Sequence, residues 1–147
     1  MASEIRSYED LDAWQQGIHL SLRLYEVATL LPKWEQYEMS SQIRRAAVSI
    51  PSNVAEGHAR RKPKPCLNLA HISLGSRAEI VRCLIIANRL GFISAERLAN
   101  ERRETDRVGQ LLHGLARSLE ERIAKEGSGP RLGLIALALS GWLAALF

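Results

Sequence analysis

The feature that most constrains the fold is a helical pattern that continues across a proline. Between Ser40 and Arg61, apolar or small residues recur at intervals of three and four, the spacing of one helix face: Ile43, Ala47, Ile50, Val54 and Gly57. Pro51 lies inside this pattern, where it removes a backbone hydrogen bond and costs about 3 kcal/mol. We therefore expect one kinked helix, with a break at residues 49–50 as the alternative.

A helix is predicted before this segment, and it carries two apolar stripes. Ser7 and Asp10 have the spacing of a capping box at its start, and Pro32 ends it because the residue before a proline avoids the α region. The stripes are Leu11, Trp14, Ile18 and Tyr25, and Leu20, Leu24, Val27 and Leu31. One stripe is expected to face the bundle and the other a neighbouring subunit.

Two further helices follow the proline-containing one, whose predicted N-cap is Ser40 or Ser41. Pro63 or Pro65 can start the third helix, which Gly91 ends, and Ser94 caps the fourth. The buried positions expected in the third helix are Leu67, Ala70, Leu74, Ala78, Val81 and Ile85. Those expected in the fourth are Leu98, Thr105, Val108, Leu112, Leu115, Leu119 and Ile123.

The predicted fold is an all-α, antiparallel up-and-down four-helix bundle with a kinked second helix, over residues 1–126. Residues 127–147 form a Gly/Pro linker and an apolar tail, in which LGLIALALSGWLAALF carries no charge. This tail is shorter than the roughly 20 residues that span a membrane. We expect it to dock on its own bundle or on a sister subunit. Membrane contact comes second, and a reading-frame artefact is a further alternative.

Positive charge is concentrated in one window. The formal net charge is +4, and residues 44–64 hold six of the 20 Lys and Arg but one of the 16 carboxylates. A local basic patch is typical of a protein that meets a polyanion; the alternative is a solvated helix end. We assign nucleic-acid contacts to the late cluster, which is Arg60, Arg61, Lys62 and Lys64. Intersubunit salt bridges are assigned to the early pair, Arg44 and Arg45.

Polar residues beside the proline are predicted to have structural roles. The carbonyl groups that Pro51 leaves without a donor are expected to bond to small polar side chains nearby, which are Ser49, Ser52 and Asn53. Glu56 and Glu79 are expected to neutralise arginines inside one bundle or between bundles, because a buried unpaired charge is costly. The candidate arginines are Arg44, Arg45 and Arg77.

Catalytic, metal and cofactor signatures are absent from the sequence. There is no P-loop, GxGxxG, GxSxG or S-x-x-K motif. None of the four histidines follows a Glu by three residues, as a di-iron bundle requires. Cys66 and Cys83 show no metal spacing and are expected as small core residues. We predict a non-enzymatic protein without cofactor, and a cytoplasmic one, because no signal sequence opens the chain.

The residues around the proline also carry a resemblance to a known family. Residues 31–57 read LPKWEQYEMSSQIRRAAVSIPSNVAEG, with YEDLDAWQQ before them and LGSRAEI at 74–80. With these motifs the chain resembles the bacterial 23S rRNA intervening-sequence protein family over residues 8–93. Departures are Cys66, Leu67 and Leu69 where the family commonly has aromatic residues, Arg77 at a usually apolar position, and the tail.

The resemblance implies a small cytosolic four-helix bundle that assembles into a ring-like homopentamer. It implies binding of a nucleic acid, RNA or DNA, and no enzymatic activity.

Overall fold

The helices begin and end at residues whose backbone chemistry favours those ends. In the computed structural model, which describes residues 7–128, Ser7 forms the predicted capping box. Ser94 caps the last helix with its side-chain oxygen, and Pro63 is the first residue of the third α-helix. Gly91 follows that helix with a φ of +77°, in the left-handed region that glycine tolerates best. The predicted boundaries at Pro63, Gly91 and Ser94 are confirmed. The Ser7 capping box opens a short 3-10 helix at Tyr8–Asp10, whereas the first α-helix begins at Asp12 without a side-chain cap.

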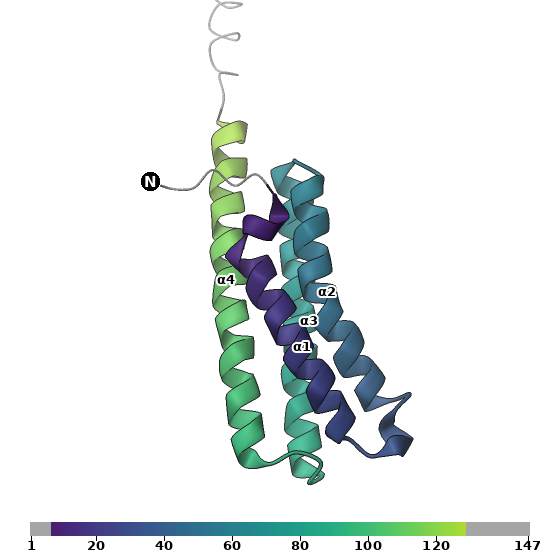
Figure 1. The fold of residues 1–147 in the computed structure, drawn as a ribbon. Coiled ribbons are helices and arrows are strands. Elements are labelled where there is room, and N and C mark those ends of the chain that lie inside the picture. The colour runs from purple at the N-terminus through teal and green to yellow at the C-terminus, as the bar shows by residue number, and fades with distance from the viewer. Residues whose placement is uncertain (1–6, 129–147) are drawn as a thin grey trace, which may run out of the picture.

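Six helical elements follow one another within residues 7–128. They are η1 (Tyr8–Asp10), α1 (Asp12–Leu30), η2 (Lys33–Glu35), α2 (Met39–Ala59), α3 (Pro63–Arg89) and α4 (Ala95–Gly127). No strand occurs within residues 7–128, so the predicted all-α four-helix bundle is confirmed. In Figure 1 successive α-helices lie side by side and the chain alternates in direction from one to the next. The packing of α1 on α4 closes the bundle.

The second helix passes through Pro51 without a break, as expected. The carbonyl of Ala47, which would otherwise bond to the residue 51 N–H, accepts instead from the Ser21 hydroxyl of α1 at 2.8 Å. The expected donors Ser49, Ser52 and Asn53 do not fill this role, so that prediction is wrong. A neighbouring helix therefore supplies the donor that Pro51 lacks, and the kink stays a prediction.

The start of α2 also differs from expectation. The helix begins at Met39 with Glu38 as its N-cap, rather than with Ser40 or Ser41. Ser40 is buried instead, and its hydroxyl donates to the Ala28 carbonyl of α1 at 3.2 Å. Because the Ser40 hydroxyl bonds to a carbonyl of α1, it is not available to cap α2. This explains why the predicted start of α2 is wrong.

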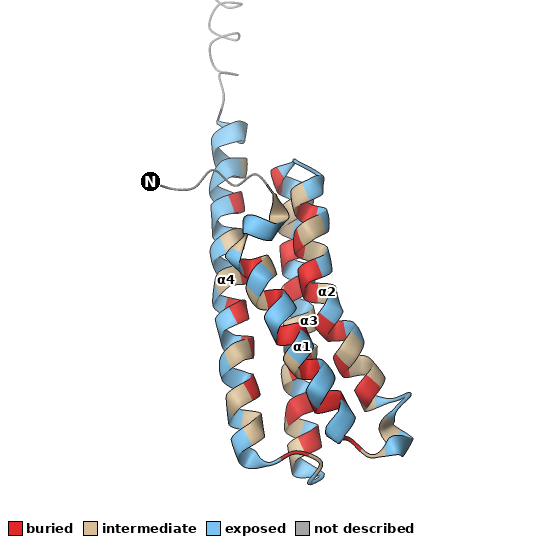
Figure 2. Cartoon of the chain, viewed as in Figure 1, coloured by how far each residue is buried: buried red, intermediate tan, exposed pale blue. Residues whose placement is uncertain are grey.

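The two apolar stripes of α1 are buried to different extents. The second stripe, Leu20, Leu24, Val27 and Leu31, is buried in the core. In the first stripe Leu11 and Trp14 are half-buried, whereas Ile18 and Tyr25 are exposed. Figure 2 shows the buried residues along the inner sides of the helices. One predicted stripe therefore forms the core, and the other leaves an apolar surface.

The buried face of α3 differs from the predicted one. Of the six expected residues only Ala70 is buried, and Ala78 is exposed. The buried set is Pro63, Leu69, Ala70, Ser73, Ile80, Cys83, Leu84 and Ala87. Because α3 packs against both α2 and α4 and carries apolar residues on several faces, periodicity alone selected the wrong stripe.

The predicted seam of α4 is confirmed in part: Thr105, Val108, Leu112 and Leu119 are buried, and the other three expected residues are half-buried. The helix also buries a charge that was not foreseen. Glu101 is fully buried, and Arg23 of α1 donates to its two carboxylate oxygens at 2.8 and 3.0 Å. The Nε of Arg97 lies 2.7 Å from Glu101 Oε1. The hydrogen bond to Glu101 raises the pKa of Arg23. This cluster fastens α1 to α4.

Within residues 7–128 no helix is both long and apolar enough to cross a membrane. The apolar tail, with its predicted docking or membrane contact, lies outside the described residues.

Candidate nucleic-acid interface

The turn between α2 and α3 is short and cationic. Arg60 is the C-cap of α2, and Lys62 is the N-cap of α3, so a single residue, Arg61, separates the caps. Arg61 has a φ of +54°, in a left-handed conformation uncommon for residues with a side chain. The reversal therefore places consecutive basic side chains at one end of the bundle.

The late cluster divides into one paired cation and three unpaired ones. Arg60 forms an ion pair with Glu56 one helical turn earlier. Arg61, Lys62 and Lys64 are exposed, and none forms an ion pair with another residue in the 7–128 range. Their charge is therefore available to an external anion.

A cavity of about 510 Å³ lies beside this turn. Its lining combines apolar residues with polar and basic ones: Leu11, Val54, Gly57, His58, Arg61, Lys62, Pro63, Cys66, Leu115, Ser118, Leu119 and Arg122. No carboxylate belongs to the part of this lining that the structure describes. The basic turn is thus continued by Arg122 of α4, which sequence reasoning missed because it reads as an ordinary solvated helix residue.

The pKa of Cys66, which lines the cavity, responds to the electrostatic environment there. Burial raises the pKa of the Cys66 thiol, and the positive charge of Arg122 opposes that shift. Cys66 is half-buried rather than part of the core, whereas Cys83 is buried as expected. Cys66 is therefore a thiol that borders a cationic cavity.

The early pair lies elsewhere. Arg44 and Arg45 border a second groove, of about 430 Å³, with Tyr25, Ser41, Val48 and Ser49. The Arg44 Nη2 donates to the Gln36 carbonyl at 3.0 Å, and Arg45 is exposed. The separation of an early and a late basic group, inferred from the sequence, corresponds to two different surfaces.

Glu56 and Glu79 do not pair with the expected arginines inside this chain. Glu56 bonds to Arg60, and Glu79 lies 3.7 Å from Arg82. Arg77 pairs with Asp106 and donates to the Thr105 carbonyl. Pairing of the two glutamates between bundles stays a prediction.

The polar residues beside Pro51 connect α2 to α3. The Asn53 side-chain amide donates to Ser49 Oγ at 2.9 Å, and Ser49 Oγ lies 2.9 Å from Ser76 Oγ. Ser76 belongs to LGSRAEI, so the two motifs quoted above meet in space. These residues connect α2 and α3 by hydrogen bonds between their side chains.

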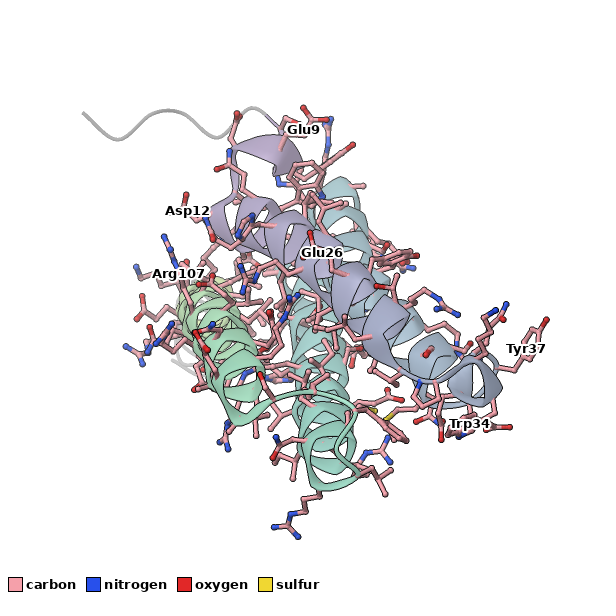
Figure 3. The ribbon with its side chains drawn as sticks, turned by 60° about the horizontal axis from the view of Figure 1, so that its bottom comes forward. Glu9, Asp12, Glu26, Trp34, Tyr37 and Arg107 are labelled. Carbon is pink, nitrogen blue, oxygen red and sulfur yellow. The ribbon has the colours of Figure 1, made fainter. Side chains whose placement is uncertain are left out.

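The two most exposed aromatic residues that the structure describes, Trp34 and Tyr37, lie at the other end of α2 from the basic turn. Trp34 and Tyr37 project from the connection that precedes α2 (Figure 3), whereas the basic turn follows α2. They are 74% and 82% exposed. Neither of these two residues is therefore available to stack on a base held at the basic turn. In the part of the chain with described coordinates, no cluster of His, Cys, Asp or Glu could hold a metal ion.

Comparisons with known proteins support the resemblance. The profile of the family described as 23S rRNA-intervening sequence protein matches residues 9–114. Among solved structures, a protein with unknown function from the S23 ribosomal protein family of Bacteroides thetaiotaomicron has a TM-score of 0.66 and 20% sequence identity. The match covers 71% of this chain and 97% of that one, and it supports the fold. A search of curated proteins finds no match. Since the profile match extends over most of the chain, the chain belongs to the 23S rRNA-intervening sequence protein family.

Proposed function

We propose that this protein is a non-enzymatic, oligomeric helical bundle that binds structured RNA through the phosphates. The observation that carries the proposal is the run of exposed cations at the α2–α3 turn, Arg61, Lys62 and Lys64, which have no carboxylate partner in the described bundle. The family description refers to 23S rRNA, which favours RNA over other polyanions.

Arg60 differs from the other three members of the late cluster. Its pair with Glu56 is exposed and spans one helical turn, and such pairs contribute only about 0.3–0.5 kcal/mol. A phosphate can therefore displace Glu56 from Arg60. We expect Arg60 to contribute less to RNA affinity than Arg61, because this exchange replaces an existing contact.

The test is a measurement of RNA affinity over a range of salt concentrations, with duplex and single-stranded RNA. Replacing Arg61, Lys62 and Lys64 together by glutamine is expected to weaken binding. It should also reduce the salt slope by about one for each lost phosphate contact. A matched control replaces three exposed arginines of α4 by glutamine: Arg102, Arg103 and Arg107. Absence of binding by the wild-type protein at low salt would refute the proposal.

A specific observation also favours self-association as a second role. Ile18, Leu22 and Tyr25 of α1 and Val48 of α2 are exposed, and the last two border the groove of the early pair. Exposed apolar residues gathered in this way mark interaction surfaces. We propose that this face forms the homopentamer, with Arg44 and Arg45 making contacts between subunits.

Light scattering of wild-type protein and of a Leu22→Glu variant tests the assembly. We expect wild-type protein to have the mass of a pentamer and the variant to dissociate, whereas Ile72→Glu on α3 serves as the exposed control. If an Arg44/Arg45 variant loses assembly but still binds RNA as wild-type protein does, the early pair belongs to the interface between subunits. If the protein assembles but binds no RNA, its role is that of a structural or protein-interaction module.

A further inference from the structure

The cavity beside the α2–α3 turn has the composition of a ligand site, and we propose that it binds one nucleotide. The phosphate would lie at the cationic rim and the base against the apolar floor. This inference rests on the proposed RNA function, because that function supplies nucleotides as the ligand class. The nucleotide can be free or an unpaired residue of an RNA strand.

The size and floor of the cavity suit a small organic ligand. Its volume of about 510 Å³ falls within the roughly 300–1,000 Å³ common for small-molecule sites. The floor includes Val54, Pro63 and Leu119, which are buried. A free phosphate would leave this apolar area unused, whereas a base would cover it.

The rim supplies positive charge from two parts of the chain. Arg61 and Lys62 come from the turn, and Arg122 comes from α4, sixty residues later; all three are exposed and line the cavity. No carboxylate lines it among the described residues, so the local charge favours an anion. Guanidinium groups bond to phosphate with two parallel hydrogen bonds and also stack on bases.

Two further side chains can read the polar edge of a base. His58 and Ser118 both line the cavity, and each can donate or accept hydrogen bonds. The backbone of Arg61 is held in the left-handed region, a conformation that is found often at ligand sites when a residue has a side chain. Apolar floor, cationic rim and hydrogen-bonding groups together match the parts of a nucleotide.

Cys66 provides a direct probe, because it lines the cavity while the second cysteine is buried. The rate of Cys66 alkylation by N-ethylmaleimide is measured on the full chain with added AMP, adenosine or inorganic phosphate. We expect AMP at ten times its dissociation constant to slow alkylation about tenfold, since only free protein reacts. Adenosine and phosphate alone should require much higher concentrations, and a Cys66→Ser variant should give no signal.

Arginine variants connect the protection to the rim. Arg61→Gln and Arg122→Gln are each expected to raise the AMP concentration needed for protection by about tenfold, the effect of losing one charge-assisted bond. The control Arg102→Gln removes the same charge from an exposed position about 30 Å along α4 from Arg122. It should leave the protection unchanged.

The outcomes separate this inference from the RNA proposal. If neither AMP nor single-stranded RNA protects Cys66 while salt-dependent RNA binding persists, the cavity proposal is wrong and the phosphate contacts of the turn stand. If phosphate alone protects as well as AMP does, the apolar floor has no part and the nucleotide proposal is also wrong. If single-stranded RNA slows Cys66 alkylation and a blunt duplex does not, the ligand is an unpaired nucleotide of a strand. If AMP slows alkylation and single-stranded RNA does not, the ligand is a free nucleotide.

Discussion

The hydroxyl of Ser21 in α1 lies 2.8 Å from the carbonyl oxygen of Ala47 in α2 and supplies a hydrogen bond that Pro51 cannot give. In a regular helix residue 51 would donate its N–H to the carbonyl of residue 47, but proline has no N–H. Gly17, one turn before Ser21, also faces the proline: a Cβ there would lie 3.5 Å from Pro51 Cβ, an ordinary van der Waals distance. The proline and its substitute donor thus occur where α1 packs directly against α2.

The first prediction concerns this substitute bond. Ser21→Ala is expected to lower the free energy of unfolding by about 1–3 kcal/mol, because the buried Ala47 carbonyl loses its donor. Urea denaturation followed by circular dichroism measures the change. In a Pro51→Ala background the helix regains its own donor, so the same serine replacement should cost less.

Ser52→Ala is the control, since Ser52 is exposed next to the proline and should change stability little. If Ser21→Ala costs as much in the Pro51→Ala background as in wild type, the hydroxyl does not compensate for the proline.

The second prediction concerns the buried carboxylate of Glu101. Glu101→Gln is expected to destabilise the protein by about 1–3 kcal/mol, because it removes the buried charge that accepts hydrogen bonds from Arg23 and pairs with Arg97. Asp106→Asn breaks a pair in which the carboxylate is 52% exposed and should cost less than about 1 kcal/mol. Urea denaturation of both variants gives the comparison, and equal effects would contradict a special role for the buried cluster.

The sequence allowed much of the fold to be predicted, because helix ends depend on local chemistry. Ser7, Pro63, Gly91 and Ser94 act through their own backbone or side chain within one turn. The continuity of α2 could be predicted too, since its apolar period persists across the proline. Local rules failed where a neighbouring helix intervened, as at Ser40, whose hydroxyl bonds to Ala28 instead of capping α2.

The contacts missed from the sequence are those between distant segments. Ser21 and Ala47 are 26 residues apart, and Arg23 and Glu101 are 78 apart, so no local pattern pairs them. The basic turn was visible as a charge cluster, but its cavity was not, because Arg122 reaches it from α4. The basic residues can thus be predicted from the sequence, whereas the cavity that they surround becomes apparent only when the packing of the helices is known.

The third prediction compares two glycines. Gly57→Ala would place its methyl 3.0 Å from Cys66 Sγ and 3.4 Å from Cys66 Cα, so the Cys66 side chain must give way by a few tenths of an ångström. Overpacking of this kind costs about 1–3 kcal/mol, more than the helix propensity gained. Gly75→Ala meets nothing within 4 Å and should stabilise by about 0.5–1 kcal/mol. Thermal unfolding measures both, and adding Cys66→Ala should recover part of the Gly57→Ala loss.

The fourth prediction concerns the pH dependence of stability. Burial raises the pKa of both Cys66 and Cys83 above that of an exposed thiol, which is about 8.5. Below that pH the thiols are protonated in the folded and unfolded states, and their contribution to stability is fully present. As pH rises further, the unfolded chain releases protons that the folded protein still holds. Stability therefore falls until pH passes the folded pKa.

Urea denaturation between pH 7 and 10 measures this decline, and replacing both cysteines by alanine should make it shallower. Lysine and tyrosine titration affects wild type and variant alike, so the comparison rests on the difference between their slopes rather than on absolute stability. Identical slopes would mean that the thiols titrate alike in both states. Where the slopes differ, a single Cys66→Ala variant shows how much of the decline in stability comes from the thiol at the cavity.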